Sequence, residues 1–168
     1  AAVTKGDFSK MEPPPRIVPI VETSQDKPRA WRFTLEKPSD DWSKADFDDK
    51  KWTAGPGGFG TNGTPGATVR TEWKSNDIWL RRQFDLQSTV FKSPHLRVHH
   101  DEDCEVYING ALALRLPGYS TEYEDFALSA ESHALLKTGS NSIAVHCRQT
   151  GGGQFIDVGL VELIENAK

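Results

Sequence analysis

The chain has 168 residues, the size of one domain, and five Trp and eight Phe residues can supply a hydrophobic core. Its formal net charge is -4, and its 20 Lys and Arg residues are scattered, which argues against the basic surface that nucleic-acid binding usually needs. No apolar run approaches the roughly 20 residues of a membrane-spanning helix. Composition therefore excludes neither an enzyme nor a binding module, but it disfavours nucleic-acid and membrane partners.

Residues 1–26 are predicted to be a linker or an extended N-terminal segment. The run Glu12-Pro13-Pro14-Pro15 favours a polyproline conformation, and Pro19 interrupts the apolar run 17–21 too much for a central strand. An edge strand tied to the domain is the alternative for this segment. Residues 27–168 are then predicted to form one module.

Apolar residues alternate with polar ones through most of the rest of the chain. This period of two occurs in the ranges 31–35, 78–86, 96–108, 143–147 and 156–160. Asn109-Gly110 predicts a tight hairpin turn, and a helical turn is predicted between residues 128 and 136. Short strands with turn signals and little helix predict an all-β protein, a β-sandwich of about eight antiparallel strands.

Three further positions lead to alternatives that the sequence leaves open. Arg82 is in phase with the apolar residues of its strand, so it needs a carboxylate partner or a bulge, whereas Arg81 points the other way. Cys104 and Cys147 are in phase with apolar neighbours, so they are either two buried free thiols or one disulfide bridge. The loop 55–66, with six glycines, could approach a ligand closely, but it lacks the Lys-Ser/Thr ending of a phosphate-binding loop.

Several sequence phrases occur in a recognisable order. They are DIWLRRQF at residues 77–84, EVYING at 105–110 and GSNSIAV at 139–145. In this order they resemble the galactose-binding-like jelly-roll modules of carbohydrate-active enzymes, particularly the sugar-binding domain of glycoside hydrolase family 2. GGGQFIDVGL at 151–160 departs from the family 2 pattern and is similar to modules appended to assorted secreted hydrolases.

That resemblance implies a jelly-roll fold and a non-catalytic role in a larger secreted or periplasmic polysaccharide-degrading enzyme. The expected partners are a polysaccharide or oligosaccharide and a parent catalytic domain in the same chain. A structural accessory domain that packs against the parent hydrolase without binding sugar is the alternative. The sequence contains no HExxH motif and no nucleophile elbow, which agrees with a non-catalytic module.

A sugar site needs an exposed aromatic face and a few planar polar side chains. The aromatic candidates are Trp73, Tyr119 and Tyr123, each of which could instead pack in the core. The polar candidates surround the predicted loops and strand ends: Asp101, Glu102, Arg148, Gln149 and Gln154. We expect these side chains to bind a glycan.

The acidic run 99–103 has three interpretations: a solvated turn, a ligand-contacting loop and a metal site. Hard carboxylate oxygens suit calcium, and the resembled fold often carries one structural calcium ion. The predicted ligands are Asp101 and Asp103, together with Asp48 from the acidic turn 46–49. Zinc is disfavoured, because the run lacks the ligand spacing of a zinc site.

Overall fold

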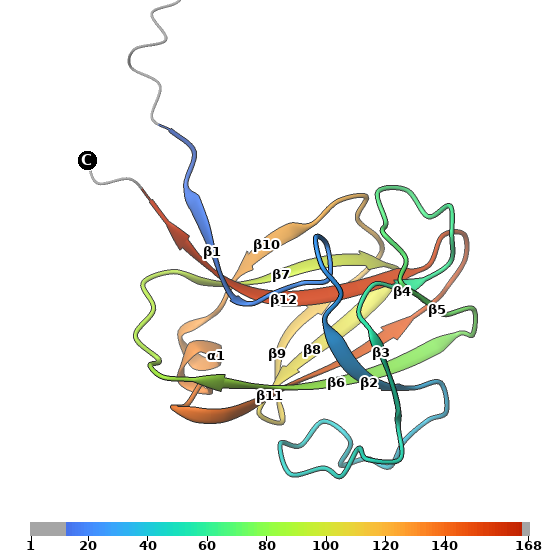
Figure 1. The fold of residues 1–168 in the computed structure, drawn as a ribbon, viewed down its shortest axis with the longest axis horizontal. Helices are drawn as coiled ribbons and strands as arrows, with labels where there is room; N and C mark the ends of the chain where they lie inside the picture. The colour runs from blue at the N-terminus through green and yellow to red at the C-terminus, as the bar shows by residue number, and fades with distance from the viewer. Residues whose placement is uncertain (1–12, 166–168) are drawn as a thin grey trace, which may run out of the picture.

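The computed structural model describes residues 13–165 and shows two β-sheets packed face to face (Figure 1). Sheet A has the strand order β10-β7-β12-β4-β5, with β1 also paired to β12, and sheet B has the order β3-β2-β6-β11-β8-β9. The pairs are antiparallel except for β4 and β5, which run parallel. The prediction of an all-β sandwich is confirmed, and the strands beyond the expected eight or so are short ones.

The strands of sheet A are β1 (Arg16–Val21), β4 (Phe59–Gly60), β5 (Thr71–Glu72), β7 (Pro94–Asp101), β10 (Glu124–Ala127) and β12 (Phe155–Ile164). Those of sheet B are β2 (Ala30–Thr34), β3 (Thr53–Pro56), β6 (Asp77–Leu86), β8 (Asp103–Ile108), β9 (Ala111–Leu116) and β11 (Gly139–Arg148). The helix α1 (Ala130–Ala134) lies within the predicted range. Across residues 13–165, no helix has the length and apolar character needed to span a membrane.

The hairpin between β8 and β9 forms where the sequence predicts it. Asn109 and Gly110 have φ values of 48° and 88°, and two successive positive φ values are what a type I′ turn requires. The Asn109 side chain also donates to the Leu135 carbonyl oxygen, at 2.8 Å, and so holds the turn against the segment after α1.

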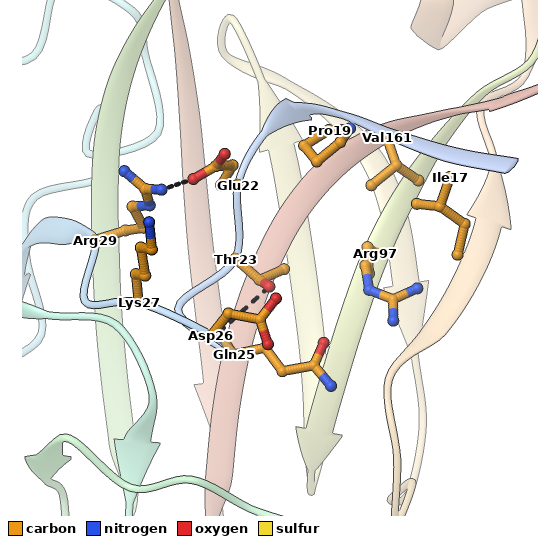
Figure 2. A pocket seen from close by; sticks show the side chains of 10 residues that line it. All are labelled: Ile17, Pro19, Glu22, Thr23, Gln25, Asp26, Lys27, Arg29, Arg97 and Val161. Carbon is orange, nitrogen blue, oxygen red and sulfur yellow. Dashed lines mark hydrogen bonds and ion pairs between the residues drawn. The ribbon is translucent and has the colours of Figure 1, made fainter.

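The N-terminal segment is partly built into the sandwich. Its residues 1–12 lie outside the described residues, but β1 pairs with β12 from Arg16 opposite Ile164 onward, which corresponds to the edge-strand alternative. The following loop crosses toward sheet B, and Figure 2 shows Glu22 paired with Arg29 in it. The Ser24 backbone amide donates to the buried Asp157 carboxylate at 2.8 Å, which fixes this loop to β12.

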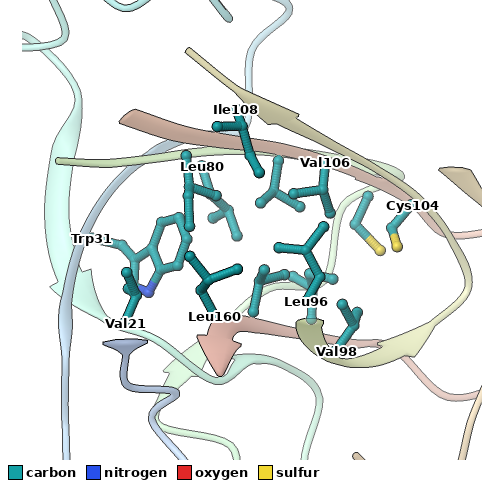
Figure 3. Close-up of a cluster of buried hydrophobic side chains, with 14 of the residues drawn as sticks. Val21, Trp31, Leu80, Leu96, Val98, Cys104, Val106, Ile108 and Leu160 are labelled. Carbon is teal, nitrogen blue, oxygen red and sulfur yellow. The ribbon is translucent and has the colours of Figure 1, made fainter. Parts of the chain in front are cut away.

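The core consists of the apolar residues that alternate along the strands of both sheets. Figure 3 shows Leu80 and Val106 of sheet B facing Leu96 and Leu160 of sheet A. Arg82, which the sequence places in phase with these residues, avoids the centre of the core: its Nη1 donates to the Glu22 carbonyl oxygen at 2.7 Å. A backbone carbonyl, not a carboxylate, is therefore its partner.

Candidate functional site

The three predicted aromatic residues lie in different environments. Trp73 is fully buried, and its Nε1 donates to the Asp77 carbonyl oxygen at 3.2 Å, so it belongs to the core. Tyr123 is half-buried, and its hydroxyl donates to Asp157 at 2.6 Å. Tyr119, in contrast, is 66% exposed. Of the three, Tyr119 is the ring that a ligand can reach.

The predicted polar residues also divide by exposure. Gln154 is buried, and its Nε2 donates to the Ser75 carbonyl oxygen at 2.6 Å, while Asp101 is only 6% exposed. Gln149 is half-buried, with its Nε2 donating to the Gly152 carbonyl oxygen at 2.8 Å. Arg148 is exposed at the end of β11. Gln154 therefore ties its loop to the segment before β6 and Asp101 is buried, whereas Arg148 is accessible to a partner.

Several of these residues meet at one end of the sandwich. Glu102 accepts a hydrogen bond from the Thr150 hydroxyl at 2.8 Å, which joins the β7–β8 junction to the loop after β11. Asp101 forms a backbone bridge with Tyr119, and Asp103 Oδ1 accepts from the Gly118 amide. We call the surface formed by Glu102, Tyr119 and Gln149 the loop end.

Behind the loop end lie two buried titratable groups. His99 is fully buried, and burial lowers its pKa to about 4, so the imidazole is neutral near pH 7. Burial, with the nearby charge of Glu102, raises the pKa of Asp101 to about 6. Among the described residues, neither His99 nitrogen nor Asp101 Oδ1 has a hydrogen-bond partner. Burial removes both groups from direct contact with a large ligand.

The predicted calcium ligands do not converge. Asp48 Oδ1 accepts from the Lys50 amide at 3.0 Å in its own turn, and Asp103 Oδ1 accepts from the Gly118 amide. Within residues 13–165, no group of three or more His, Cys, Asp or Glu side chains is arranged to hold a metal ion. The residues present therefore do not fit a carboxylate calcium site, and the calcium ion stays a prediction from the sequence.

Two surface hollows are lined by residues other than those of the loop end. A hollow of about 360 Å³ lies beside β1, and Figure 2 shows its lining of charged and aliphatic side chains. Its lining has three cations, of which Arg29 is paired with Glu22 and Arg97 is paired with Asp125 at 3.0 Å. A groove of about 390 Å³ crosses the outer face of sheet B, where His146 and Glu105 contribute to its lining. The sequence analysis missed these two residues, because outward positions on separate strands become neighbours only through the strand register.

No protein-family model matches the sequence, and the comparison with curated proteins gives no match either. Solved structures do share the fold. A glycoside hydrolase family 2 member from Bacteroides cellulosilyticus superposes with a TM-score of 0.58 and 16% identity, covering 88% of this chain and 20% of that chain. β-Glucuronidase 2 from Bacteroides uniformis superposes with a TM-score of 0.59 and 22% identity, covering 88% of this chain and 18% of that chain.

A β-glycosidase from Bacteroides vulgatus gives a TM-score of 0.53 with 18% identity, covering 86% of this chain and 20% of that chain. These three similar structures are glycoside hydrolases. At these identities the likeness shows the fold alone. The chain spans about one fifth of the length of the enzymes it matches.

Proposed function

We propose that this chain is a non-catalytic accessory domain of a longer, secreted or periplasmic carbohydrate-active enzyme, and that it binds a glycan. The observation that supports this most is the coverage: the fold extends over 88% of this chain but only 20% of a family 2 glycoside hydrolase. A domain of that share corresponds to one module of a larger enzyme. Its proposed partners are a polysaccharide or oligosaccharide and a parent catalytic domain.

Exposed chemistry supports glycan contact over catalysis. Tyr119 offers an accessible ring of the kind that packs on the C–H face of a pyranose, and Arg148 offers planar donors for hydroxyl groups. A hydrolase that protonates its leaving group needs a paired acid and base in an accessible cleft. Asp101, whose pKa is raised to about 6, lies buried instead.

The test uses the purified chain of 168 residues. We expect saturable binding to at least one polysaccharide, by glycan array and then calorimetry, with Kd about 10 µM to 1 mM. We expect no product from polysaccharides or aryl glycosides at high protein concentration. Release of product from any of these substrates would refute the non-catalytic assignment, and absence of binding to every glycan tested would refute sugar binding.

The alternative, a structural domain that binds no sugar, has its own support. Val90 is 88% exposed and Ile164 is 38% exposed, and both line a hollow of about 590 Å³ near the end of β12. Exposed apolar side chains around a hollow are typical of a surface that packs against another domain. A parent enzyme whose stability falls on Val90→Asp, while the isolated chain is unaffected and binds no glycan, would favour this alternative.

A further inference from the structure

The outer face of sheet B carries a row of side chains from four neighbouring strands. Trp79 of β6 lies opposite His146 of β11, His146 lies opposite Glu105 of β8, and Glu105 lies opposite Arg115 of β9. Directly paired residues on one face have side chains in contact range. We call Trp79, His146, Glu105 and Arg115 the His146 row.

Side chains two positions apart on a strand point to the same face of a sheet, so a second set of residues, each two positions from a member of the His146 row, shares the outer face of sheet B. Arg148 lies opposite Asp77 on one side and opposite Asp103 on the other. Asp103 is exposed, Arg148 is exposed, and Asp77 is partly exposed. The His146 row and this second set together form a polar surface across the end of the sheet.

Contacts with one another and with Asp77 and Tyr107 fix the Trp79, His146 and Glu105 side chains in place. The His146 ring stacks on Trp79 with 4.8 Å between centroids and 5° between planes. His146 Nε2 and Asp77 Oδ1 form a hydrogen bond of 2.7 Å. Glu105 Oε2 accepts from the Tyr107 hydroxyl at 2.7 Å. Groups held in this way lose little conformational entropy when they bind a ligand.

Glu105, Arg115 and His146 of the His146 row line the groove of about 390 Å³, a volume within the range of small-ligand sites. The lining residues are Asp103, Cys104, Glu105, Arg115, Leu116, Pro117, His146 and Arg148. The exposed ring of Tyr119 follows Pro117 by two residues, and Asp103 Oδ1 accepts from the Gly118 amide between them. The lining of the groove therefore includes Pro117, two residues before the most exposed aromatic ring of the loop end.

The groove keeps hydrogen-bonding capacity that the protein does not use. Toward the other described residues, Arg148 makes no side-chain hydrogen bond, Glu105 Oε1 accepts none, and His146 Nδ1 has no partner. Partial burial acts to raise the pKa of Glu105, but hydrogen bonds from Tyr107 and Arg115 outweigh it and leave the pKa lowered. Glu105 is thus a charged acceptor at neutral pH, beside the donors of Arg148.

The charged side chains at the groove indicate whether its ligand is neutral or anionic. Two carboxylates, from Asp103 and Glu105, and two guanidinium groups, from Arg115 and Arg148, line the groove. Asp77, which is hydrogen-bonded to His146, adds a third carboxylate beside it. The carboxylates outnumber the guanidinium groups by one, so the surface lacks the cationic surplus that a polyanionic ligand would need. Mixed planar donors and acceptors match the hydroxyl groups of a neutral ligand.

We infer that this groove binds a neutral oligosaccharide, with Glu105, His146 and Arg148 making hydrogen bonds to its hydroxyl groups and Tyr119 packing at one end. The inference rests on the proposed glycan-binding function and gives that function a site on the outer face of sheet B.

The test measures binding of neutral hexasaccharides from β-glucan, xylan, mannan and galactan to the purified chain by calorimetry, with hexagalacturonate as an anionic probe. We expect Arg148→Ala and Glu105→Gln each to weaken the best neutral ligand at least tenfold, which corresponds to about 1.4 kcal/mol. Arg32→Ala is the matched control, because Arg32 is an exposed arginine of the same sheet outside the groove. It should leave Kd unchanged.

The outcomes separate this inference from the function on which it rests. If a glycan binds and Gln149→Ala weakens it while Arg148→Ala and Glu105→Gln do not, the groove is wrong and the binding function stands. Tighter binding of hexagalacturonate than of every neutral probe would overturn the ligand class. If no probe binds a chain with a normal melting transition, both the groove and the glycan-binding function are refuted.

Discussion

Arg81 and Asp49 form an ion pair of 3.0 Å between Nε and Oδ2, beneath the segment that leads from β2 to β3. Arg81 is 1% exposed. Its Nη1 also donates to the carbonyl oxygens of Trp42 at 2.7 Å and Lys44 at 2.9 Å. The guanidinium carbon lies 5.2 Å from the centre of the Phe47 ring. One side chain of β6 thus holds the segment 42–49 on the outer face of sheet B.

Replacing Arg81 should therefore destabilise the chain strongly. We expect Arg81→Met to lower the free energy of unfolding by about 3 kcal/mol, because Asp49 and the carbonyl groups of Trp42, Lys44 and Phe47 each lose a donor. Urea denaturation measures the loss. The control is Arg32→Ala, since Arg32 is exposed and makes one hydrogen bond, to the Trp52 carbonyl oxygen at 3.1 Å. Equal losses in the two variants would show that the segment 42–49 is not anchored by Arg81.

Arg81 also shows why sequence reasoning succeeds for the fold and fails for parts of the surface. Alternation along a strand is local, so it identifies the inward residues of β6 and β11 and hence the sandwich. The same alternation assigns Arg81 to the outward face, where it lies buried because the distant segment 42–49 covers it. His146 and Glu105 become neighbours only through the pairing of β8 with β11. Strand register between distant segments is not encoded in local periodicity.

Trp73 provides a test of core packing against ligand contact. Because its ring is fully buried, we expect Trp73→Ala to cost about 3–5 kcal/mol, the usual loss when a large core residue is truncated. Val90→Ala should change stability by less than about 0.5 kcal/mol, since Val90 is 88% exposed. Thermal and urea denaturation give both values. A Trp73→Ala variant that keeps its stability but loses glycan binding would place Trp73 at the ligand instead.

The contribution of Asp157 to stability should fall as pH rises from about 4 to about 6, while the buried imidazole of His99, whose pKa is lowered to about 4, contributes in the opposite direction. Asp157 is 1% exposed, and burial raises its pKa from 3.8 to about 6 despite hydrogen bonds from Tyr123 and the Ser24 amide. The folded chain then holds this proton more tightly than the unfolded chain. The stabilisation from Asp157 is therefore complete below the pKa of the unfolded chain, and it is lost as pH rises through the pKa of the folded chain. The expected loss from Asp157 is about 3 kcal/mol, measured by urea denaturation across that range.

Two other carboxyl groups define the control for this pH dependence. Asp101, with its pKa raised to about 6, contributes in the same direction and His99 in the opposite one, so the Asp157 contribution is the difference in unfolding free energy between the chain and its Asp157→Asn variant across this pH range. The pKa of Glu105 is lowered, so Glu105 stabilises the folded chain at pH values above the pKa of the unfolded chain. This stabilisation is lost as the solution becomes more acidic. A slope that Asp157→Asn leaves unchanged would contradict the assignment to Asp157.

Cys104 and Cys147 face each other across β8 and β11 as free thiols. The Asn109 amide donates to the Ser142 carbonyl oxygen at 3.0 Å, and this hydrogen bond shows which residue pairs of β8 and β11 are hydrogen-bonded and which are not. It makes Cys104 and Cys147 a non-hydrogen-bonded pair, the kind whose side chains lie closer together. Burial raises the pKa of Cys104 to about 12 and that of Cys147 well above its ordinary value.

Both thiols should therefore resist modification while the chain is folded, because the thiolate is the reactive form. We expect no reaction with an aromatic disulfide reagent at pH 8 in native buffer, and reaction of both thiols in guanidinium chloride. Rapid labelling of either cysteine in the folded chain would contradict their burial. A purified chain whose mass is lower by two hydrogens would show instead that the pair is bridged.

The glycine-rich loop 55–66 yields a matched pair of substitutions. Gly66 has φ of +73°, and a Cβ added there would lie 1.9 Å from the Thr121 carbonyl oxygen, whereas Gly63 has φ of +89° and nothing within 4 Å. Alanine in the left-handed region costs about 1–2 kcal/mol at either position. We expect Gly66→Ala to cost at least about 2 kcal/mol more than Gly63→Ala, because the backbone at Thr121 must move. Urea denaturation compares the two, and equal losses would mean that the loop does not rest on Thr121. The expected difference would assign Gly66 to packing between loops, not to the close approach of a ligand.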